Sequence, residues 1–537
     1  MFNTSRVRSR RLSAPGLRFS LVGLALLAVL PAQLRAEVPP PDAAAAEMSA
    51  RVDALLSEHW TAEGVAPAPS ASDAEFMRRV YLDLTGIIPK VSEVRAFLRD
   101  DSPEKRARLI EELLARPTHS VHLSNTWRHI LLPGEADVQA GGGVAGFQNW
   151  LRQQFAENVR YDAVVADLLM ARGSARQNGP ALFYTSLELK PEEIAASTSR
   201  IFLGVQIQCA QCHDHPFDRW KQHDFWGYAA FFARVQQRRA DLTNIIQVED
   251  APTGEVQLPD TDEIVKPKYL DWQEANPDND DNRRRQLAIW LVSRDNPYFA
   301  RASVNRVWAH LFGRGIVDPV DDFSERNPPS HPQLLDELAA YFVETGFDLR
   351  GLFQMLANTQ AYQLSSESTA AEEEPRPELF ARMAVKSLTP EQLYDCLAEA
   401  TRRREMISAA QRANGSSRFQ DPDRLEFIAR FQAPTQSAVE FQSGIPQALT
   451  LMNGRTIAEA TDLERSGLLT ALSAPLFSDD ERIEIMFLST LTRLPTDAER
   501  SRFASYVEGG GPTGDRRQAL GDVLWALLNS AEFILNH

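Results

Sequence analysis

The sequence predicts a mainly α-helical protein, with two helical domains joined by a short insert of irregular or β-hairpin structure. A chain of 537 residues is longer than one hydrophobic core normally grows, and its hydrophobic content of 43% is that of an ordinary globular protein. Apolar residues recur at helical spacing in both halves of the chain. Between residues 239 and 283 this spacing disappears, and Pro, Asp, Asn and Gly accumulate. We therefore predict the domain boundary there.

Residues 1–36 have the pattern of a secretory signal peptide. Several arginines, Arg10 and Arg11 among them, precede the uncharged apolar run 19–32, and Ala36 is a small residue at the expected cleavage position. The run is shorter than the roughly 20 residues that a membrane-spanning helix needs. We expect an exported, periplasmic protein that has no transmembrane segment after signal cleavage.

A linker over 37–46 is expected to precede the first helical domain, which we predict over 47–238. Apolar residues on both sides of Gly86 and Pro89 indicate a helical hairpin that breaks at those two residues. Lys190-Pro191-Glu192-Glu193 is typical of a helix start, because proline suits the first turn and acidic residues suit the positive end of the helix dipole. The apolar helix that follows leads towards residue 209.

The irregular insert is predicted over 239–283, and the second helical domain over 284–537. Within the insert, Glu249–Glu255 resembles a hairpin turn between short strands. In the second domain, Thr496-Asp497-Ala498-Glu499 fits a capping box, in which threonine and glutamate satisfy each other's backbone donors.

Net charge and cysteine content exclude two classes of protein. The formal net charge is −16, and such a field repels nucleic-acid backbones, so no nucleic-acid partner is expected. Only three cysteines are present, Cys209, Cys212 and Cys396, too few for a disulfide-stapled scaffold. Two of them share one short motif, which indicates a chemical role.

That motif, Cys209-Ala210-Gln211-Cys212-His213, has the pattern of a c-type haem attachment site. Two thiols three residues apart can reach the two vinyl groups of one porphyrin, and the histidine that follows can ligate the iron. The sequence thus predicts haem c, held by Cys209 and Cys212 with His213 as axial ligand. The position of the sixth ligand is either open or filled by one of three candidates: His223, His129 and Met170.

Two other chemistries fit the same stretch. A metal, zinc above all, has enough ligand types nearby for a tetrahedral shell, although no second Cys or His pair is present. A disulfide between Cys209 and Cys212 is the other alternative. The metal alternative draws on Cys209, Cys212, His213, His215, Asp218 and His223.

A second polar site is conceivable near residue 310. A dyad of His310 with Asp321 or Asp322 has the residue types for acid–base catalysis. No nucleophile elbow or metal-ligand spacing accompanies it, and buried hydrogen bonding explains these residues equally, so catalytic residues stay unknown. The polar and aromatic side chains in question are Asn305, Arg306, Trp308, His310, Asp321 and Asp322.

Several longer segments resemble a known family. The segments are 79–86, 202–206 running into 209–218, 302–315, 451–454 and 528–533. They are similar to exported planctomycete and verrucomicrobial proteins in which a cytochrome-like domain precedes a planctomycete-specific domain; these are domains of unknown function 1549 and 1553. The resemblance covers nearly the whole mature chain and implies the same haem motif.

These observations lead us to expect a periplasmic haem protein in electron transfer, or in redox support of a partner enzyme, with a redox or secreted protein as partner. One alternative is a binding or scaffold protein stabilised by zinc or a disulfide. Another is an accessory or hydrolytic protein in polysaccharide breakdown, for which no catalytic constellation is found.

Overall fold

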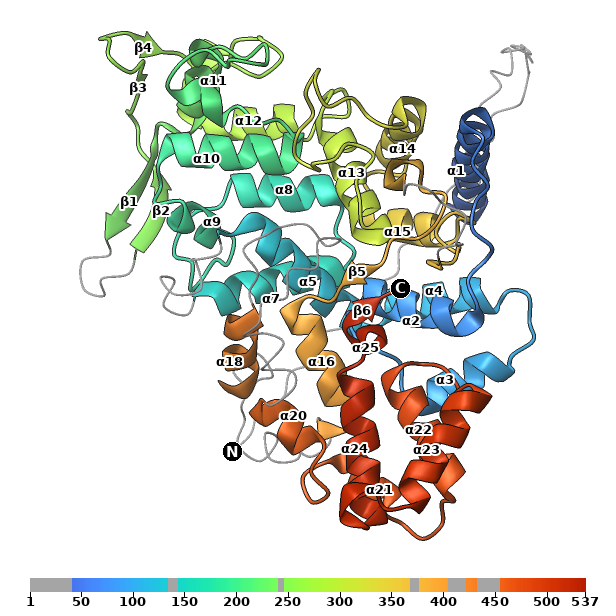
Figure 1. Ribbon diagram of the computed structural model, residues 1–537. Helices are drawn as coiled ribbons and strands as arrows, with labels where there is room; N and C mark the ends of the chain where they lie inside the picture. Colours follow the sequence, from blue (N-terminus) through green and yellow to red (C-terminus); the bar gives the residue numbers. More distant parts are fainter. Residues whose placement is uncertain (1–40, 134–142, 240–245, 368–375, 404–421, 432–453) are drawn as a thin grey trace, which may run out of the picture. The chain divides into compact units, whose positions relative to one another are not determined.

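The computed structural model describes residues 41–133, 143–239, 246–367, 376–403, 422–431 and 454–537 (Figure 1). These residues are mainly α-helical, with three small two-stranded sheets among them, which confirms the predicted fold class. The predicted signal peptide lies outside the described residues, as do Leu451–Asn453 of the family-like segment 451–454.

The first helix, α1, spans Pro41–Glu63. The prediction of a linker over 37–46 is therefore wrong from residue 41 onwards. Alanine has the highest helix propensity and proline is well tolerated at the first position of a helix, so this Ala-rich stretch with one leading proline forms the first turns of α1.

The predicted helical hairpin is confirmed as α2, Asp73–Thr85, and α3, Val91–Arg99. Gly86 ends α2 in the left-handed conformation with φ of 68°, which glycine adopts without steric cost. A Cβ atom at Gly86 would lie 2.5 Å from His122 Nδ1. The helix end thus packs directly on a buried histidine of α5, Pro117–Leu131.

The rest of the first half continues as short helices. They are α4 (Lys105–Ala115), α5 (Pro117–Leu131), α7 (Gly143–Ala156), α8 (Tyr161–Leu169), α9 (Ala181–Ser186), α10 (Pro191–Thr198), the π-helix η1 (Ser199–Leu203), the 3₁₀ helices η2 (Gln208–Gln211) and η3 (Ala230–Phe232), and α11 (Gln222–Ala229).

The insert holds two small antiparallel sheets. Strand β1, Val235–Arg239, pairs with β2, Ile246–Asp250, and β3, Val256–Gln257, pairs with β4, Ile264–Val265. The predicted hairpin turn at 249–255 is wrong, because this segment connects strands of two different sheets. Turn-forming residues mark a change of direction, but they do not say which strands pair across it.

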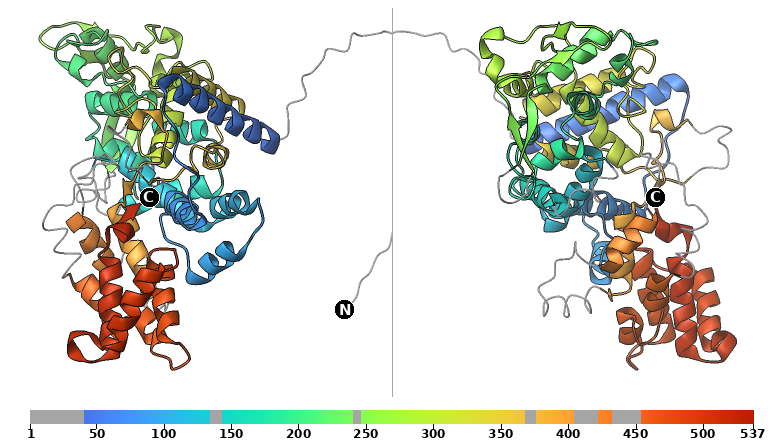
Figure 2. Two further views of the ribbon diagram at one scale, coloured as in Figure 1. Left: turned by 45° about the vertical axis from the view of Figure 1, so that its right-hand side comes forward. Right: turned by 90° about the vertical axis from the view of Figure 1, so that its left-hand side faces the viewer.

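The second half is again helical, and the predicted capping box is confirmed at the start of α23, Asp497–Glu508, where Thr496 N donates to Glu499 Oε2 over 2.8 Å. Helix α23 lies side by side with α22, Asp479–Thr490, and α24, Arg516–Leu528, in all views (Figures 1 and 2). The elements are η4 (Pro277–Asn282), α12 (Arg283–Leu291), α13 (Phe299–Phe312), α14 (Pro332–Glu344), α15 (Leu349–Ala357), η5 (Pro377–Leu379), β5 (Lys386–Ser387), α16 (Pro390–Ala400), α18 (Pro422–Phe431), α20 (Arg455–Ala460), α21 (Gly467–Leu472), α22 (Asp479–Thr490), α23 (Asp497–Glu508), η7 (Gly511–Thr513), α24 (Arg516–Leu528), α25 (Ala531–Ile534) and β6 (Leu535–Asn536), which pairs with β5.

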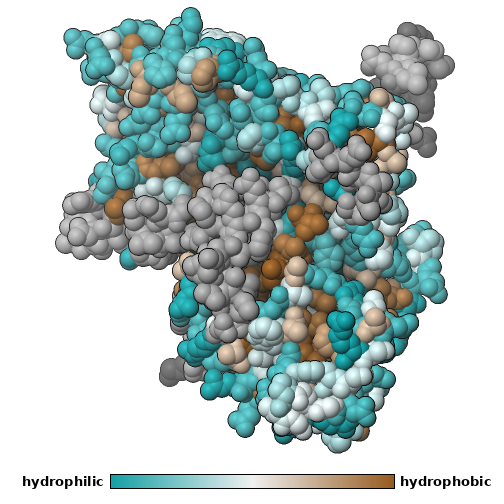
Figure 3. All heavy atoms as spheres, viewed as in Figure 1, coloured by the Kyte–Doolittle hydropathy of each residue, from teal (hydrophilic) through white to brown (hydrophobic). Residues whose placement is uncertain are grey.

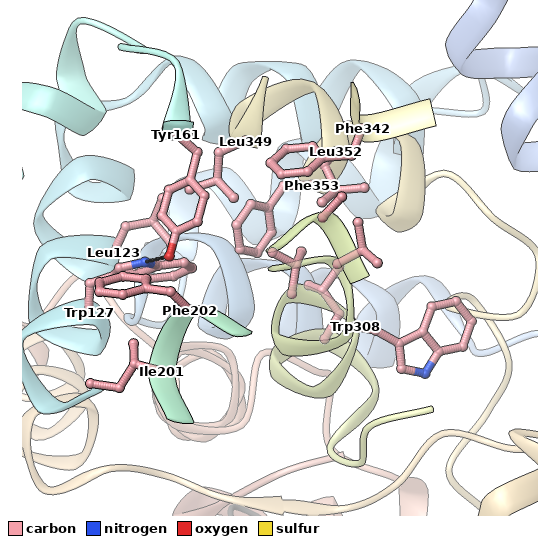
Figure 4. Close-up of a cluster of buried hydrophobic side chains, with 14 of the residues drawn as sticks. Leu123, Trp127, Tyr161, Ile201, Phe202, Trp308, Phe342, Leu349, Leu352 and Phe353 are labelled. Carbon is pink, nitrogen blue, oxygen red and sulfur yellow. Dashed lines mark hydrogen bonds between the residues drawn. The ribbon is translucent and has the colours of Figure 1, made fainter. Parts of the chain in front are cut away.

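Two main hydrophobic cores hold these helices. The larger is built mainly from residues between Val52 and Met383, on both sides of the insert. Figure 4 shows part of it, where Trp127 Nε1 donates to the Tyr161 hydroxyl over 3.2 Å and Ile201 and Phe202 of η1 are packed among other apolar side chains. The second core lies among the C-terminal helices. The division into two domains at 239–283 stays a prediction.

The surface in Figure 3 is mainly hydrophilic over the part of the chain around α10, α11 and α12, with single hydrophobic side chains between the polar ones. Among the described residues, no helix combines the length and the apolar character that crossing a membrane requires.

Candidate functional site

A π-helical turn and a glycine lead the chain out of the core towards the cysteine motif. Helix α10 begins with Pro191, as predicted, and passes into η1, whose Ile201 and Phe202 are buried. Gly204 ends η1 with φ of 68°, and a Cβ atom there would lie 2.5 Å from Phe323 Cδ2. The helix therefore stops before the motif, and the predicted apolar helix does not continue to residue 209.

The two cysteines instead stand on the separate 3₁₀ turn η2. Cys209 lies within the turn and Cys212 directly follows it, and both thiols are exposed and free. Between them Ala210 is fully buried, so the turn is anchored by its middle while both thiols face outwards. All three cysteines of the chain lie in described residues and none forms a disulfide, Cys396 being buried in α16.

Helix α11 holds the backbone of this turn. Gln222 Nε2 donates to the carbonyl oxygens of Gln211 (3.2 Å) and Cys212 (3.0 Å), and Trp226 Nε1 also donates to Gln211 O (3.0 Å). Because these bonds engage only backbone oxygens, they fix the turn and leave both thiols accessible.

The two histidines after the cysteines present different ring nitrogens. His213 is exposed, and its Nδ1 donates to Asp214 O over 2.8 Å, so its Nε2 carries the lone pair. His215 Nδ1 instead accepts a bond from Phe217 N over 3.2 Å, which places the proton of its neutral ring on Nε2. A backbone carbonyl that binds the far N–H is the usual support of a metal-ligating histidine. His213 therefore has the ligand geometry, and His215 does not.

The side chains given as the alternative zinc ligands, between Cys209 and His223, do not converge on one point. Within the residues that the structure describes, which include all of 209–223, no three His, Cys, Asp or Glu side chains are gathered to hold a metal ion. Asp218 Oδ1 accepts from Arg219 N over 2.7 Å, and His223 Nε2 lies 3.8 Å from Glu263 Oε2.

The three candidates for a sixth ligand lie in different surroundings. His129 Nε2 donates to Glu391 Oε1 of α16 over 2.6 Å. Burial raises the pKa of Glu391, but the bonds and charges of His129 and Arg128 outweigh burial and bring that pKa down to about 2. Met170, 39% exposed, follows α8 and lines a cavity that none of residues 209–213 line. His223 belongs to α11, the helix that contacts η2, and is therefore the one candidate on an element packed against the motif.

The side chains of the predicted second polar site make structural contacts. Asn305 Nδ2 donates to Val317 O, and Val317 N donates to Asn305 Oδ1, both over 2.9 Å. Arg306 binds Ile201 O over 3.1 Å and also binds the Asp321 carboxylate, whose other oxygen accepts from Arg200 over 2.7 Å. These bonds tie α13 and the loop after it to η1.

The dyad of His310 with Asp321 is not formed, because His310 Nε2 donates to Asp83 O over 2.9 Å and Asp321 is bound to two arginines. Trp308 is fully buried and stacks on Phe312 with ring centroids 4.0 Å apart. Asp322 lies in the loop with Asp321, and its backbone carbonyl accepts from Asn327 Nδ2 over 2.9 Å.

A buried polar network around Asp83 was not predicted from the sequence. Asp83 Oδ1 accepts from Lys386 Nζ (2.6 Å) and Asn536 Nδ2 (2.7 Å), and Oδ2 accepts from the Tyr362 hydroxyl (2.8 Å). Burial, and next the charge of Asp83, raise the pKa of Tyr362 well above its usual value. The partners of Asp83 lie hundreds of residues away in the sequence. The one sign of this network in the sequence was therefore that Asp83 belongs to the family-like segment 79–86.

Comparison with known families gives two matches. Residues 51–237 match the model PSCyt2, described as a protein of unknown function (DUF1549), and residues 283–507 match PSD1, described as a protein of unknown function (DUF1553). No curated protein and no solved structure matches the chain. With both domains in this order, the chain belongs to the family of proteins in which a PSCyt2 domain is followed by a PSD1 domain.

Proposed function

We propose that this protein is an exported c-type haem-binding protein that exchanges electrons with a partner protein in the periplasm. Export rests on the signal-peptide pattern of residues 1–36. The observation that carries the haem assignment is the geometry of the motif: two free, exposed thiols stand three residues apart, directly before a histidine whose Nε2 is open.

The residues present fit a haem. Cys209 and Cys212 would hold the porphyrin through thioether bonds, and His213 Nε2 would ligate the iron. The bond from His213 Nδ1 to Asp214 O fixes the ring orientation and raises the basicity of Nε2. Phe217, in the loop after the motif, is 63% exposed and offers apolar surface there, although the Arg326 guanidinium lies over its ring, 4.4 Å from the centroid.

When bound, a c-type haem supplies one-electron redox chemistry. The chain's own contribution is to place the attachment residues on a turn whose backbone carbonyls are bound by α11 and whose two cysteines stay exposed. Electrons then need to cross little protein to reach a docked partner, which supports a role in electron transfer.

Expression of the protein with a cytochrome c maturation system tests the proposal. We expect a coloured product whose pyridine haemochrome spectrum is of the c type and whose haem stays attached on denaturing gels. The double variant Cys209→Ser/Cys212→Ser is expected to lose covalent haem entirely, because both thioether donors are gone. Cys396→Ala, in which a buried cysteine outside the motif is changed, should retain it.

A histidine pair gives the second control. His213→Ala is expected to alter the spectrum of the bound haem, whereas His215→Ala should leave it as in the wild type, because the two ring nitrogens are engaged differently. Colourless wild-type protein that carries stoichiometric zinc, lost in Cys212→Ser, would contradict the haem assignment and support the metal site.

A further inference from the structure

A second site lies in a cavity of about 240 Å³ away from the cysteine motif. Its lining combines two apolar side chains, one carboxylate and five arginines, and it includes none of residues 209–213. The lining residues are Met170, Arg172, Phe231, Arg234, Asp250, Arg283, Arg284 and Arg285.

Arg284 forms a fixed wall of this cavity. Its Nε and Nη2 donate to the two oxygens of Asp250, each over 2.6 Å, and its Nη1 donates to Ala171 O over 2.9 Å. The guanidinium also lies 4.9 Å from the centroid of the Tyr184 ring. A bidentate, buried guanidinium of this kind keeps its position when a ligand enters.

Arg283 and Arg234, which also line the cavity, both bind the carboxylate of Glu255. Arg283 Nη2 donates to Glu255 Oε1 over 2.8 Å, and Arg234 Nη2 donates to the same oxygen over 3.2 Å. Arg283 Nη1 further binds Gly254 O over 3.3 Å. Two guanidinium groups thus meet at one carboxylate oxygen.

The cavity is rich in arginine although the protein is acidic. Five of its eight lining residues are arginines and one, Asp250, is a carboxylate, whereas the whole chain carries a formal charge of −16. Arg283, Arg284 and Arg285 also occupy the first turn of α12, which holds no acidic residue. Cations at this end of a helix oppose the helix dipole. A bound anion would therefore offset both the repulsion among the arginines and their unfavourable interaction with the dipole.

Two arginines at the edge remain available to a ligand. Arg285 is exposed, and within the described part of the chain it has no hydrogen bond or ion pair. The Arg172 side chain is 62% exposed and reaches Asp250 Oδ2 with Nη2 over 2.7 Å. Their long side chains can turn onto an anion that the fixed arginines attract.

We propose that this cavity binds the oxyanion group of a small molecule: a phosphate, a sulfate or a carboxylate. Its volume is below the 300 to 1,000 Å³ that is typical of drug-sized ligands, so it accepts a head group with a short organic part. Met170 and Phe231 provide the apolar contact for that part. The proposal is independent of haem binding.

Isothermal titration calorimetry of the purified full chain tests this proposal. The probes are inorganic phosphate, inorganic sulfate, acetate and glucose 6-phosphate, each compared with sodium chloride at the same ionic strength. We expect saturable binding of at least one oxyanion and none with chloride. Tighter binding of glucose 6-phosphate than of phosphate assigns the site to an organic ester, and equal binding assigns it to the free anion.

Matched charge variants decide whether the cavity is responsible. Arg285→Gln is expected to weaken oxyanion binding about tenfold, because it removes one charge-assisted contact. Arg294→Gln removes the same charge from an exposed position that does not line the cavity, and should bind as the wild type does. Equal binding in Arg285→Gln and the wild type, or no saturation above the chloride control, would overturn the proposal.

Discussion

Mild acid is expected to destabilise the protein through its buried histidines, and His119 allows the size of the effect to be worked out. His119 is only 2% exposed, and burial lowers its pKa from 6.5 to about 4, although the bond that its Nδ1 donates to Leu84 O works the other way. The folded state therefore binds fewer protons than the unfolded state below pH 6.5. The contribution of His119 to the free energy of unfolding is therefore fully present above pH 6.5 and is lost as the pH falls towards 4.

At pH 5 this residue is expected to cost about 2 kcal/mol, because 1.5 pH units below the unfolded pKa correspond to about 1.4 kcal/mol each. Burial also lowers the pKa of His331 and His537 to about 4. The wild type should then lose several kcal/mol between pH 7 and pH 5.

Urea unfolding at the two pH values, followed by circular dichroism, measures the loss. His119→Asn keeps a donor for Leu84 O and cannot titrate, so its loss between pH 7 and pH 5 should be smaller by about 2 kcal/mol. Ser120→Ala, on the same helix, removes a partly buried hydrogen bond to Pro117 O without a titrating group and should keep the wild-type pH dependence. An unchanged pH dependence in His119→Asn would refute the reasoning.

Two further pairs of substitutions test a buried ion pair and a close backbone contact. Lys386→Met leaves the Asp83 carboxylate buried without its cation and should lower the free energy of unfolding by about 3 to 5 kcal/mol. Arg51→Met breaks a solvent-accessible pair with Glu337, which water screens, and should lower it far less. Equal losses in denaturant titrations would contradict this. Gly204→Ala should cost about 2 to 4 kcal/mol, since it combines a left-handed backbone with overlap on Phe323. Gly346→Ala, with φ of 72° and no atom within 4 Å of the added Cβ, should cost only the backbone share of about 1 to 2 kcal/mol. Equal values for the two glycines in thermal melts would argue against the Phe323 contact.

Local signals in the sequence predicted the helices well. The hairpin around Gly86, the start of α10 at Pro191 and the capping box at Thr496 all depend on residues within one or two turns of each other. The break at Gly204 was missed because its cause is the close approach of Phe323, more than a hundred residues later. Contacts of this kind leave no periodic trace in the chain.

The candidate site was predicted in part. The identity and spacing of Cys209, Cys212 and His213 are visible in the sequence, but the 3₁₀ turn that exposes them depends on Gln222 and Trp226 of α11. The side chains around Asp83 were beyond prediction, because aspartate, lysine and asparagine so far apart give no sign that they pair. The same limit applied to His310, whose partner is Asp83 O and not Asp321.

The separation between Asp83 and Asn536 also bears on the order in which the protein can fold. Their hydrogen bond spans 453 residues, and Arg78, on the same helix, donates to Phe533 O over 2.7 Å. A chain that leaves the ribosome, or a secretion channel, from its N-terminus exposes the polar side chains of α2 long before these partners emerge. Helix α2 can reach its native surroundings only after the rest of the chain has been delivered.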